Sequence, residues 1–291
     1  MKPSSFEYSA PADLAEAIGL LSELGEDAKA IAGGQSLVPL LALRLAAPPH
    51  LVDLRRLSEL RGVERRDEGL WIGAGTTQAT IERSAEVATD VPLLARATPL
   101  IGHFQIRNRG TIGGCMAHAD PAGEYPAVAL TLDAQVHTCS PRGSRGIPAD
   151  RFFTGIWSTD LAPDELVTGV TFPQWTGRTG FAVEEFARRR GDYAIAGATV
   201  AVEVDTDDRI GRCAIGLFGL GSTPLRASAA EAAVTGSAVR DVPVEELGQQ
   251  AVRDLDDIPT ALHASAGYRR RVAAVVLARA MRRAIEEAAH A

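Results

Sequence analysis

The apolar residues of this chain occur in short runs, which limits the folds that it can adopt. The longest runs, Ser36 to Leu43 and Val272 to Ala278, are far shorter than the roughly 20 apolar residues of a membrane-spanning helix. With 291 residues, of which 46% are hydrophobic, the chain is long enough to bury one large core, and we expect two smaller ones. Because its start also lacks an apolar signal core, the sequence predicts a globular, two-domain, cytoplasmic protein without a transmembrane segment.

The net charge and the cysteine content argue against nucleic-acid-binding, metal-binding and disulfide-rich proteins. The net charge of -7 argues against a nucleic-acid surface and favours small molecules and proteins as partners. Only three cysteines occur, Cys115, Cys139 and Cys213. They are too scattered for a CxxC metal site or for an iron–sulfur cluster, which needs about four thiolates. We therefore expect neither a metal site nor a disulfide framework in this chain.

The first part of the chain alternates between helical and extended patterns. Apolar residues from Pro11 to Leu24 follow helical spacing, and Gly25 is typical of a helix C-cap. Ala28 to Ala32 is expected to be a strand, Leu37 to Leu45 a helix and Leu51 to Leu54 another strand. This order predicts a small α/β unit with parallel strands.

The next part has an α+β character. A strand is expected over Leu70 to Gly75, several helical patterns follow, and a helix runs from Glu124 to about Asp133. Strands at Ala134 to Cys139 and Leu166 to Phe172 are joined by a loop rich in Pro, Arg and Gly, which suggests antiparallel pairing. The sequence FPQWTGRTG then has the composition of a boundary loop. We expect an N-terminal domain over 1–176, with subdomains of about 1–57 and 58–176, and a second domain over 177–291.

The C-terminal part starts with extended patterns and ends with helices. Val183 to Arg188, Ala194 to Val204 and Arg212 to Leu217 predict a three-stranded antiparallel sheet, with a hairpin turn over Thr206 to Asp208. In the last helix, Leu277 belongs to an apolar face. The fold class is thus α+β. We expect an N-terminal domain made of two parts and a C-terminal domain in which a helical bundle follows the three-stranded sheet.

Two glycine pairs can approach a ligand closely. The first lies in Ala32-Gly33-Gly34-Gln35-Ser36, between a strand and a helix, where adjacent glycines leave backbone amides accessible to a phosphate. The second lies in Thr111-Ile112-Gly113-Gly114-Cys115, followed by Asp120 and Glu124 before a helix. Each pair alone can be an ordinary tight turn. Together they favour a dinucleotide, which has two phosphates and two ring systems.

Other nucleotide and hydrolase motifs are absent from the sequence. It has no GxxxxGK[ST], and Gly73-Ala74-Gly75 continues to Gln78 where a dinucleotide fingerprint requires a third glycine. No GxSxG nucleophile elbow occurs either. A P-loop, an NAD-type Rossmann domain and an α/β-hydrolase are therefore not supported.

Three segments carry a family resemblance. AGGQSLVPLL, RNRGTIGGCMAHADPAGEYPAVAL and ARRRGDYAIAGATVAVEV occur in the order found in the FAD-binding medium subunits of the CO dehydrogenase and xanthine dehydrogenase family, and Tyr268 to Arg271 resembles the opening of that family's last helix. By this resemblance the two glycine loops surround the FAD pyrophosphate, Asp120 and Glu124 make polar contacts, and Tyr193 lies beside the isoalloxazine. The implied binding residues are Ala32, Gly33, Gly34, Gln35, Ser36, Thr111, Ile112, Gly113, Gly114, Cys115, Asp120, Glu124 and Tyr193.

The sequence departs from the family pattern at three places. Cys115 replaces a common Ser or Asn, Gln35 replaces a histidine of some relatives, and Glu184 and Glu185 stand where a basic residue is common. By the resemblance, the first change either weakens a hydrogen bond to the cofactor or leaves the thiol to pack, the second is expected to change little, and the last is expected to alter the charge near the flavin.

The resemblance implies an electron-transfer subunit. A large partner subunit would hold the molybdenum cofactor, a small one would hold [2Fe-2S] clusters, and FAD on this chain would pass electrons to an external acceptor in a dimer of heterotrimers. No catalytic acid, base or nucleophile is then required of this chain. Two alternatives remain open at this stage: a stand-alone FAD-dependent oxidoreductase, which needs its own substrate pocket, and a flavin-free scaffold subunit.

Overall fold

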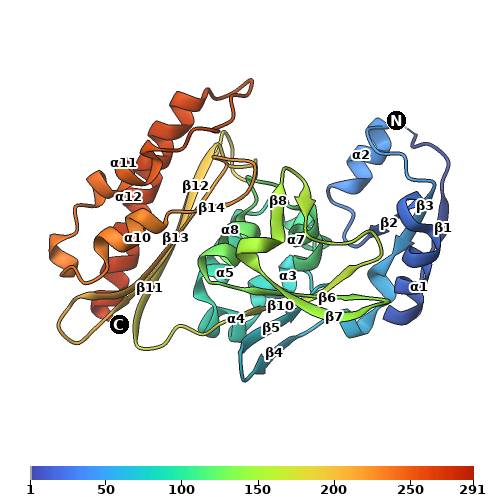
Figure 1. The fold of residues 1–291 in the computed structure, drawn as a ribbon, viewed down its shortest axis with the longest axis horizontal. Helices are drawn as coiled ribbons and strands as arrows, with labels where there is room; N and C mark the ends of the chain where they lie inside the picture. The colour runs from blue at the N-terminus through green and yellow to red at the C-terminus, as the bar shows by residue number, and fades with distance from the viewer. Residues whose placement is uncertain (1) are drawn as a thin grey trace.

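The structure is a computed structural model that describes residues 2–291, and its three larger sheets are arranged in a row (Figure 1). The N-terminal unit contains a parallel three-stranded sheet in the order β1-β3-β2, as the sequence predicts for its two longer strands. Helix α1 starts after Asp13, whose side chain accepts a hydrogen bond from the Glu16 amide, and it ends at Gly25 with φ 55°. Pro11 therefore precedes the helix instead of lying in its first turn. The unit comprises β1 (Glu7–Ser9), α1 (Leu14–Leu24), β2 (Ala28–Ile31), α2 (Leu37–Leu43) and β3 (His50–Asp53).

The central part contains an antiparallel five-stranded sheet in the order β4-β5-β10-β6-β7. The expected pairing of β6 with β10 is confirmed, whereas the edge strands β4 and β7 were not predicted. Its strands are β4 (Val63–Arg66), β5 (Gly69–Gly73), β6 (Gln135–Ser140), β7 (Gly143–Pro148) and β10 (Leu166–Phe172), with a two-stranded ribbon of β8 (Phe153–Gly155) and β9 (Ser158–Thr159).

Short helices surround this sheet, and α8 is the most deeply placed because all eight of its residues are buried. The helices are α3 (Gln78–Arg83), α4 (Ala85–Asp90), α5 (Pro92–Ala97), α6 (Phe104–Arg107), α7 (Ile112–His118), α8 (Glu124–Thr131) and α9 (Ala149–Phe152). Short 3-10 turns occupy Gly25–Asp27, Leu54–Arg56, Ser58–Leu60, Thr98–Leu100 and Val239–Asp241.

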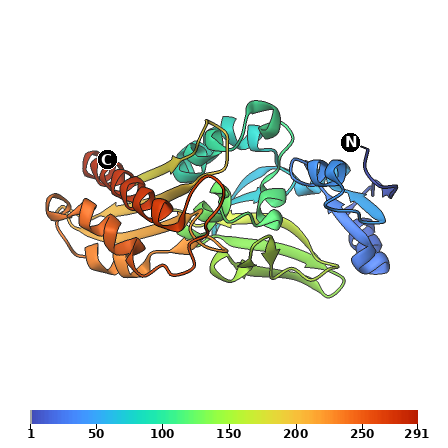
Figure 2. The ribbon, with the colours of Figure 1, turned by 90° about the horizontal axis from the view of Figure 1, so that it is seen from above.

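The C-terminal part has the three expected long antiparallel strands, to which the two-residue β14 adds a fourth. Long helix α12 lies along one face of this sheet (Figure 2). Leu277 of α12 is fully buried, as its helical spacing predicts. The elements are β11 (Arg178–Phe186), β12 (Ala196–Val204), β13 (Ile210–Phe218), β14 (Leu225–Arg226), α10 (Ser228–Val234), α11 (Val244–Arg253) and α12 (Ala266–His290).

Glycines let helices approach both faces of this last sheet. A Cβ on Gly180 of β11 would lie 1.9 Å from the Ala284 carbonyl oxygen of α12, and one on Gly216 of β13 would lie 2.2 Å from the Thr131 hydroxyl of α8. The sheet is therefore packed between α12 and α8. The loop between β11 and β12, which carries Tyr193, lies near the segment before α8, because the charges of Asp120 and Glu124 act on the Tyr193 phenol. The residue after β13 also contacts this segment, since the Gly219 amide donates to the Pro121 carbonyl at 2.8 Å.

No helix among residues 2–291 combines the length and the apolar composition that a membrane crossing requires.

Candidate functional site

The two glycine loops lie against each other. A Cβ on Gly33 would lie only 2.2 Å from the Arg109 carbonyl oxygen and 2.8 Å from the Gly110 Cα. A Cβ on Gly114 would lie 3.9 Å from the Ala32 Cβ. Only a residue without a side chain permits the first of these approaches. The fold thus joins two loops that are far apart in the sequence into one cradle.

The first loop has free backbone donors. Among residues 2–291, nothing accepts a hydrogen bond from the amides of Gly33, Gly34 or Gln35. Gly34 has φ +74°, a left-handed conformation that glycine adopts without strain. The Gln35 side chain folds back and its Nε2 donates to the Gly33 carbonyl at 3.0 Å. These half-exposed amides can bind an anion, as the sequence predicts for this loop.

The second loop uses its amides within the protein. Ile112 donates to the Thr76 carbonyl at 3.1 Å and Gly113 to the Ala74 carbonyl at 2.9 Å, while Gly114 donates to the Thr111 hydroxyl at 3.1 Å. Gly113 is needed because its Cβ would lie 2.5 Å from that of Ala74. The second loop therefore packs closely against the protein, and only the first loop has amides free to donate hydrogen bonds to a ligand.

Cys115 is the last residue of this loop and faces Gln78, which no sequence motif indicates as a site residue. The Gln78 Nε2 donates to the Cys115 Sγ at 3.0 Å, while the buried Gln78 Oε1 has no hydrogen-bond partner among the described residues. Burial, followed by the charge of Glu124, raises the pKa of the Cys115 thiol to about 12. The thiol therefore stays protonated at neutral pH. Thr77 caps the helix that Gln78 begins, but no local pattern indicates the contact with Cys115.

Asp120 organises the turn before α8. Its Oδ1 accepts from the Ala122 amide at 2.9 Å, and its Oδ2 lies 3.4 Å from the Trp157 Nε1. The Trp157 ring stacks on that of His118 with centroids 6.4 Å apart, although Trp157 itself is 66% exposed. Its backbone has φ 53°, which is unusual for a bulky residue. Trp157 thus lies beside the candidate site residue Asp120, and no sequence motif indicates this contact because Trp157 lies in the turn of the unpredicted ribbon β8–β9.

Tyr193 reaches the same region from the loop between β11 and β12. Its side chain is 57% exposed, and the Ser36 hydroxyl is close enough to interact with its phenol. Partial burial and the nearby Asp120, Cys115 and Glu124 raise the pKa of Tyr193. The structure thus gathers Ser36, Cys115 and Tyr193, which come from three separate segments of the chain, around one region.

The two acidic residues of β11 have opposite environments. The Glu184 side chain faces α12, where Arg283 pairs with it. Glu185 lies on the other face, and its Oε2 is buried without a hydrogen-bond partner among the described residues. Only Glu185 therefore contributes a carboxyl group on the side of the glycine loops.

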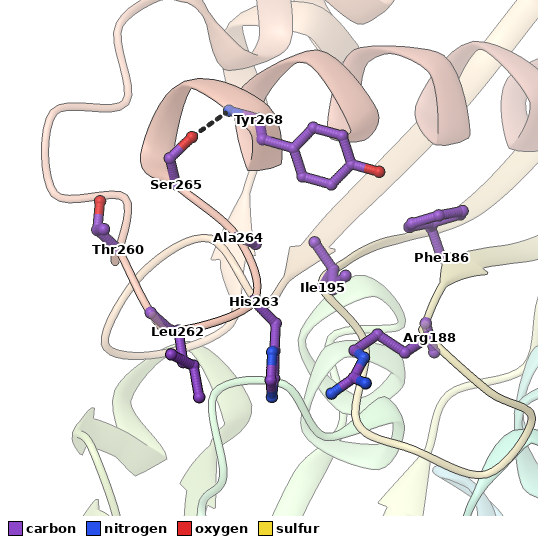
Figure 3. A pocket seen from close by; sticks show the side chains of 11 residues that line it. Phe186, Arg188, Ile195, Thr260, Leu262, His263, Ala264, Ser265 and Tyr268 are labelled. Carbon is purple, nitrogen blue, oxygen red and sulfur yellow. Dashed lines mark hydrogen bonds between the residues drawn. The ribbon is translucent and has the colours of Figure 1, made fainter.

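A separate open pocket of about 910 Å³ lies at the start of α12. Phe186, Arg188 and Ile195 line one side of it, and His263 and Tyr268 line the other (Figure 3). None of the residues predicted to bind FAD lines it, so the pocket is distinct from the glycine-loop cradle. Among residues 2–291, no cluster of three or more His, Cys, Asp or Glu side chains has the geometry of a metal site.

Two family models and several known proteins match this chain over nearly its whole length. The family described as the FAD binding domain in molybdopterin dehydrogenase matches residues 4–175, and the CO dehydrogenase flavoprotein C-terminal domain matches residues 181–284. The chain is 41% identical to the 6-hydroxypseudooxynicotine dehydrogenase complex subunit alpha of Paenarthrobacter nicotinovorans, over 99% of this chain and 97% of that one. It is 36% identical to the carbon monoxide dehydrogenase medium chain of Hydrogenophaga pseudoflava, over 97% of both chains.

Solved structures agree with these sequence matches. A chain of the Hydrogenophaga pseudoflava carbon monoxide dehydrogenase, in a form that lacks the Mo-pyranopterin moiety, superposes with a TM-score of 0.95 at 38% identity, and 99% of each chain is covered. Because matches of this extent and identity cover both halves of the fold, the chain belongs to the FAD-binding medium subunits of the CO dehydrogenase and xanthine dehydrogenase family of oxidoreductases.

Proposed function

We propose that this chain binds FAD non-covalently at the glycine-loop cradle and transfers electrons within a molybdenum hydroxylase complex. The observation that carries the proposal is the contact of the two loops at Gly33, beside the free amides of Gly34 and Gln35. The contact residues that we propose are those implied by the family resemblance: Ala32, Gly33, Gly34, Gln35, Ser36, Thr111, Ile112, Gly113, Gly114, Cys115, Asp120, Glu124 and Tyr193.

The residues present fit two parts of FAD, the pyrophosphate and the flavin ring. Free amides at Gly33, Gly34 and Gln35 suit a pyrophosphate, and the tight loop contact excludes side chains from that place. The exposed Tyr193 offers an aromatic face to the flavin ring. The buried, unpartnered Gln78 Oε1 beside Cys115 is an acceptor that a bound group or a water can satisfy.

Bound FAD would supply two-electron and one-electron chemistry, so this chain needs to position the cofactor and to adjust its potential. We propose that electrons arrive from [2Fe-2S] clusters of a small partner subunit. A large partner subunit holds the molybdenum cofactor and the substrate. One copy of each of the three subunits forms a heterotrimer, and two heterotrimers form a dimer in the cytoplasm. We also propose that the chain divides functionally into residues 1–176, with subdomains of about 1–57 and 58–176, and residues 177–291.

Acid precipitation tests the cofactor assignment. We expect a purified, yellow protein to release FAD into the supernatant, because the two glycine loops offer backbone amides and contain neither a His nor an ionised Cys for covalent attachment. The Cys115 thiol is protonated and bonded to Gln78, which supports this expectation. Colour that remains in the pellet would contradict non-covalent binding, and a folded but colourless complex would support the flavin-free scaffold instead.

A further inference from the structure

Two carboxyl groups lie beneath the candidate site without a cation. Glu124 is the first residue of α8 and is only 6% exposed. Glu185 comes from β11 and is half-buried, with its Oε2 wholly buried and unpartnered. In the described part of the chain neither carboxyl group forms an ion pair. Arg283 of α12 pairs instead with Glu184, on the opposite face of β11. Uncompensated buried carboxylates are costly, so the pair requires an explanation.

Strand register places the two side chains at the same junction. Glu185 is paired with Gly197, which is paired in turn with Phe218, and directly paired residues point to the same face of a sheet. The Phe218 ring covers Gly197 and packs against Ala127 of α8. Glu124 lies three residues, or about one helical turn, before Ala127. Glu185 and the start of α8 therefore lie on the two sides of one small apolar cluster.

We propose that Glu124 and Glu185 form a proton-accepting pair that takes up a proton when the bound flavin is reduced. The inference rests on the FAD function proposed above, in which Glu124 and Tyr193 lie beside the cofactor. Two-electron reduction of bound FAD with uptake of a single proton would add one negative charge beside Glu124 and Glu185. A second proton, from solvent, then forms one O–H bond on a carboxylate oxygen of the pair. The added charge is thereby neutralised close to where it arises.

The electrostatics of the pair support this role. Burial, and then the charges of Glu185 and Asp120, raise the pKa of Glu124 to about 8, and burial raises the pKa of Glu185 to about 7. The titratable groups that face the pair are Cys115 of α7, Asp120 before α8, Tyr125 of α8 and Tyr193 of the loop between β11 and β12. Because all of these groups are acids, none of them places a positive charge beside the pair, and a proton bound by the pair itself can offset a new negative charge.

The pH dependence of the flavin midpoint potential tests the proposal. For a two-electron reduction, uptake of one proton changes the potential by about 30 mV per pH unit, and uptake of two changes it by about 59 mV. Above about pH 7 we expect the flavin-loaded wild type to exceed the one-proton slope. The double variant E124Q/E185Q should fall to that slope. The control E184Q should behave as the wild type, because Glu184 faces α12 and pairs with Arg283.

Infrared spectroscopy provides a second test that does not need the flavin. At pH 7 the full chain should show the carbonyl band of a protonated carboxylic acid, which should be weaker in E124Q, absent from E124Q/E185Q and unchanged in E184Q. Absence of that band from the wild type would overturn the proposal, as would equal potential slopes in flavin-loaded wild type and double variant. A protein that holds no FAD would instead contradict the proposed function.

Discussion

At Gly33 a single methyl group would occupy the space in which the two glycine loops meet. Because its Cβ would lie 2.2 Å from the Arg109 carbonyl oxygen, Gly33→Ala should separate the loops and weaken FAD binding by at least about tenfold. The measurement is the FAD content of the purified protein, followed by titration of the FAD-free form. The control is Gly19→Ala on α1, where nothing lies within 4 Å and alanine favours the helix. Equal FAD content in the two variants would show that the loop contact is not needed.

The buried carboxyl of Glu124 should make stability fall as pH rises. Its folded pKa of about 8 lies above the value of about 4.3 for an unfolded glutamate, so the folded state binds this proton more tightly. The resulting stabilisation is complete below the unfolded pKa and is lost as pH rises through about 8. Denaturant unfolding between pH 5 and pH 9 should thus show a smaller decrease for Glu124→Gln than for the wild type. Parallel pH curves would contradict the burial of an ionisable carboxyl here.

Among the elements, the contact between β11 and α12 depends on Gly180. A Cβ there would lie 1.9 Å from the Ala284 carbonyl oxygen, so Gly180→Ala must displace either the helix or the strand. We expect a loss of about 1–3 kcal/mol in the free energy of unfolding, as for other overpacked cores. Gly211→Ala on β13 is the control, since the nearest atom to its Cβ is the Glu203 carbonyl oxygen at 3.8 Å. Similar unfolding midpoints for both variants would contradict the close packing.

Long periodic elements could be predicted from the sequence, and short edge elements could not. The spacing around Leu277 indicated the buried face of α12 because 25 residues repeat the pattern. By contrast, β7 has the sequence GSRGIP, in which only Ile147 is apolar and buried, and β1 has three residues. The candidate site also has a part that the sequence predicts and a part that it does not. Its glycine motifs are local, whereas the contacts of Gln78 with Cys115 and of Trp157 with Asp120 arise only from tertiary packing.

For the whole molecule, the proposed function requires partner subunits to oxidise an organic substrate. The sequence has three cysteines, which are too few for an iron–sulfur cluster, so the clusters would have to belong to other subunits. Co-expression with its genomic neighbours should therefore yield a larger complex that holds molybdenum, iron and FAD. Size-exclusion chromatography with metal analysis checks this, and the isolated chain should be at most a slow diaphorase. A chain that elutes alone and turns over a small substrate at about 10 per second would favour a stand-alone flavin enzyme.

The proposed contacts come from the N-terminal unit at Ser36, from the central part at Cys115 and from the loop before β12 at Tyr193. A ligand that touches all three stabilises their arrangement by about 2.7 kcal/mol at a concentration 100 times its Kd. That is a large share of the 5–15 kcal/mol by which a typical protein is stable. If FAD is that ligand, the FAD-free chain unfolds and is degraded more often than the FAD-bound chain, so the amount of protein in the cell depends on the supply of FAD.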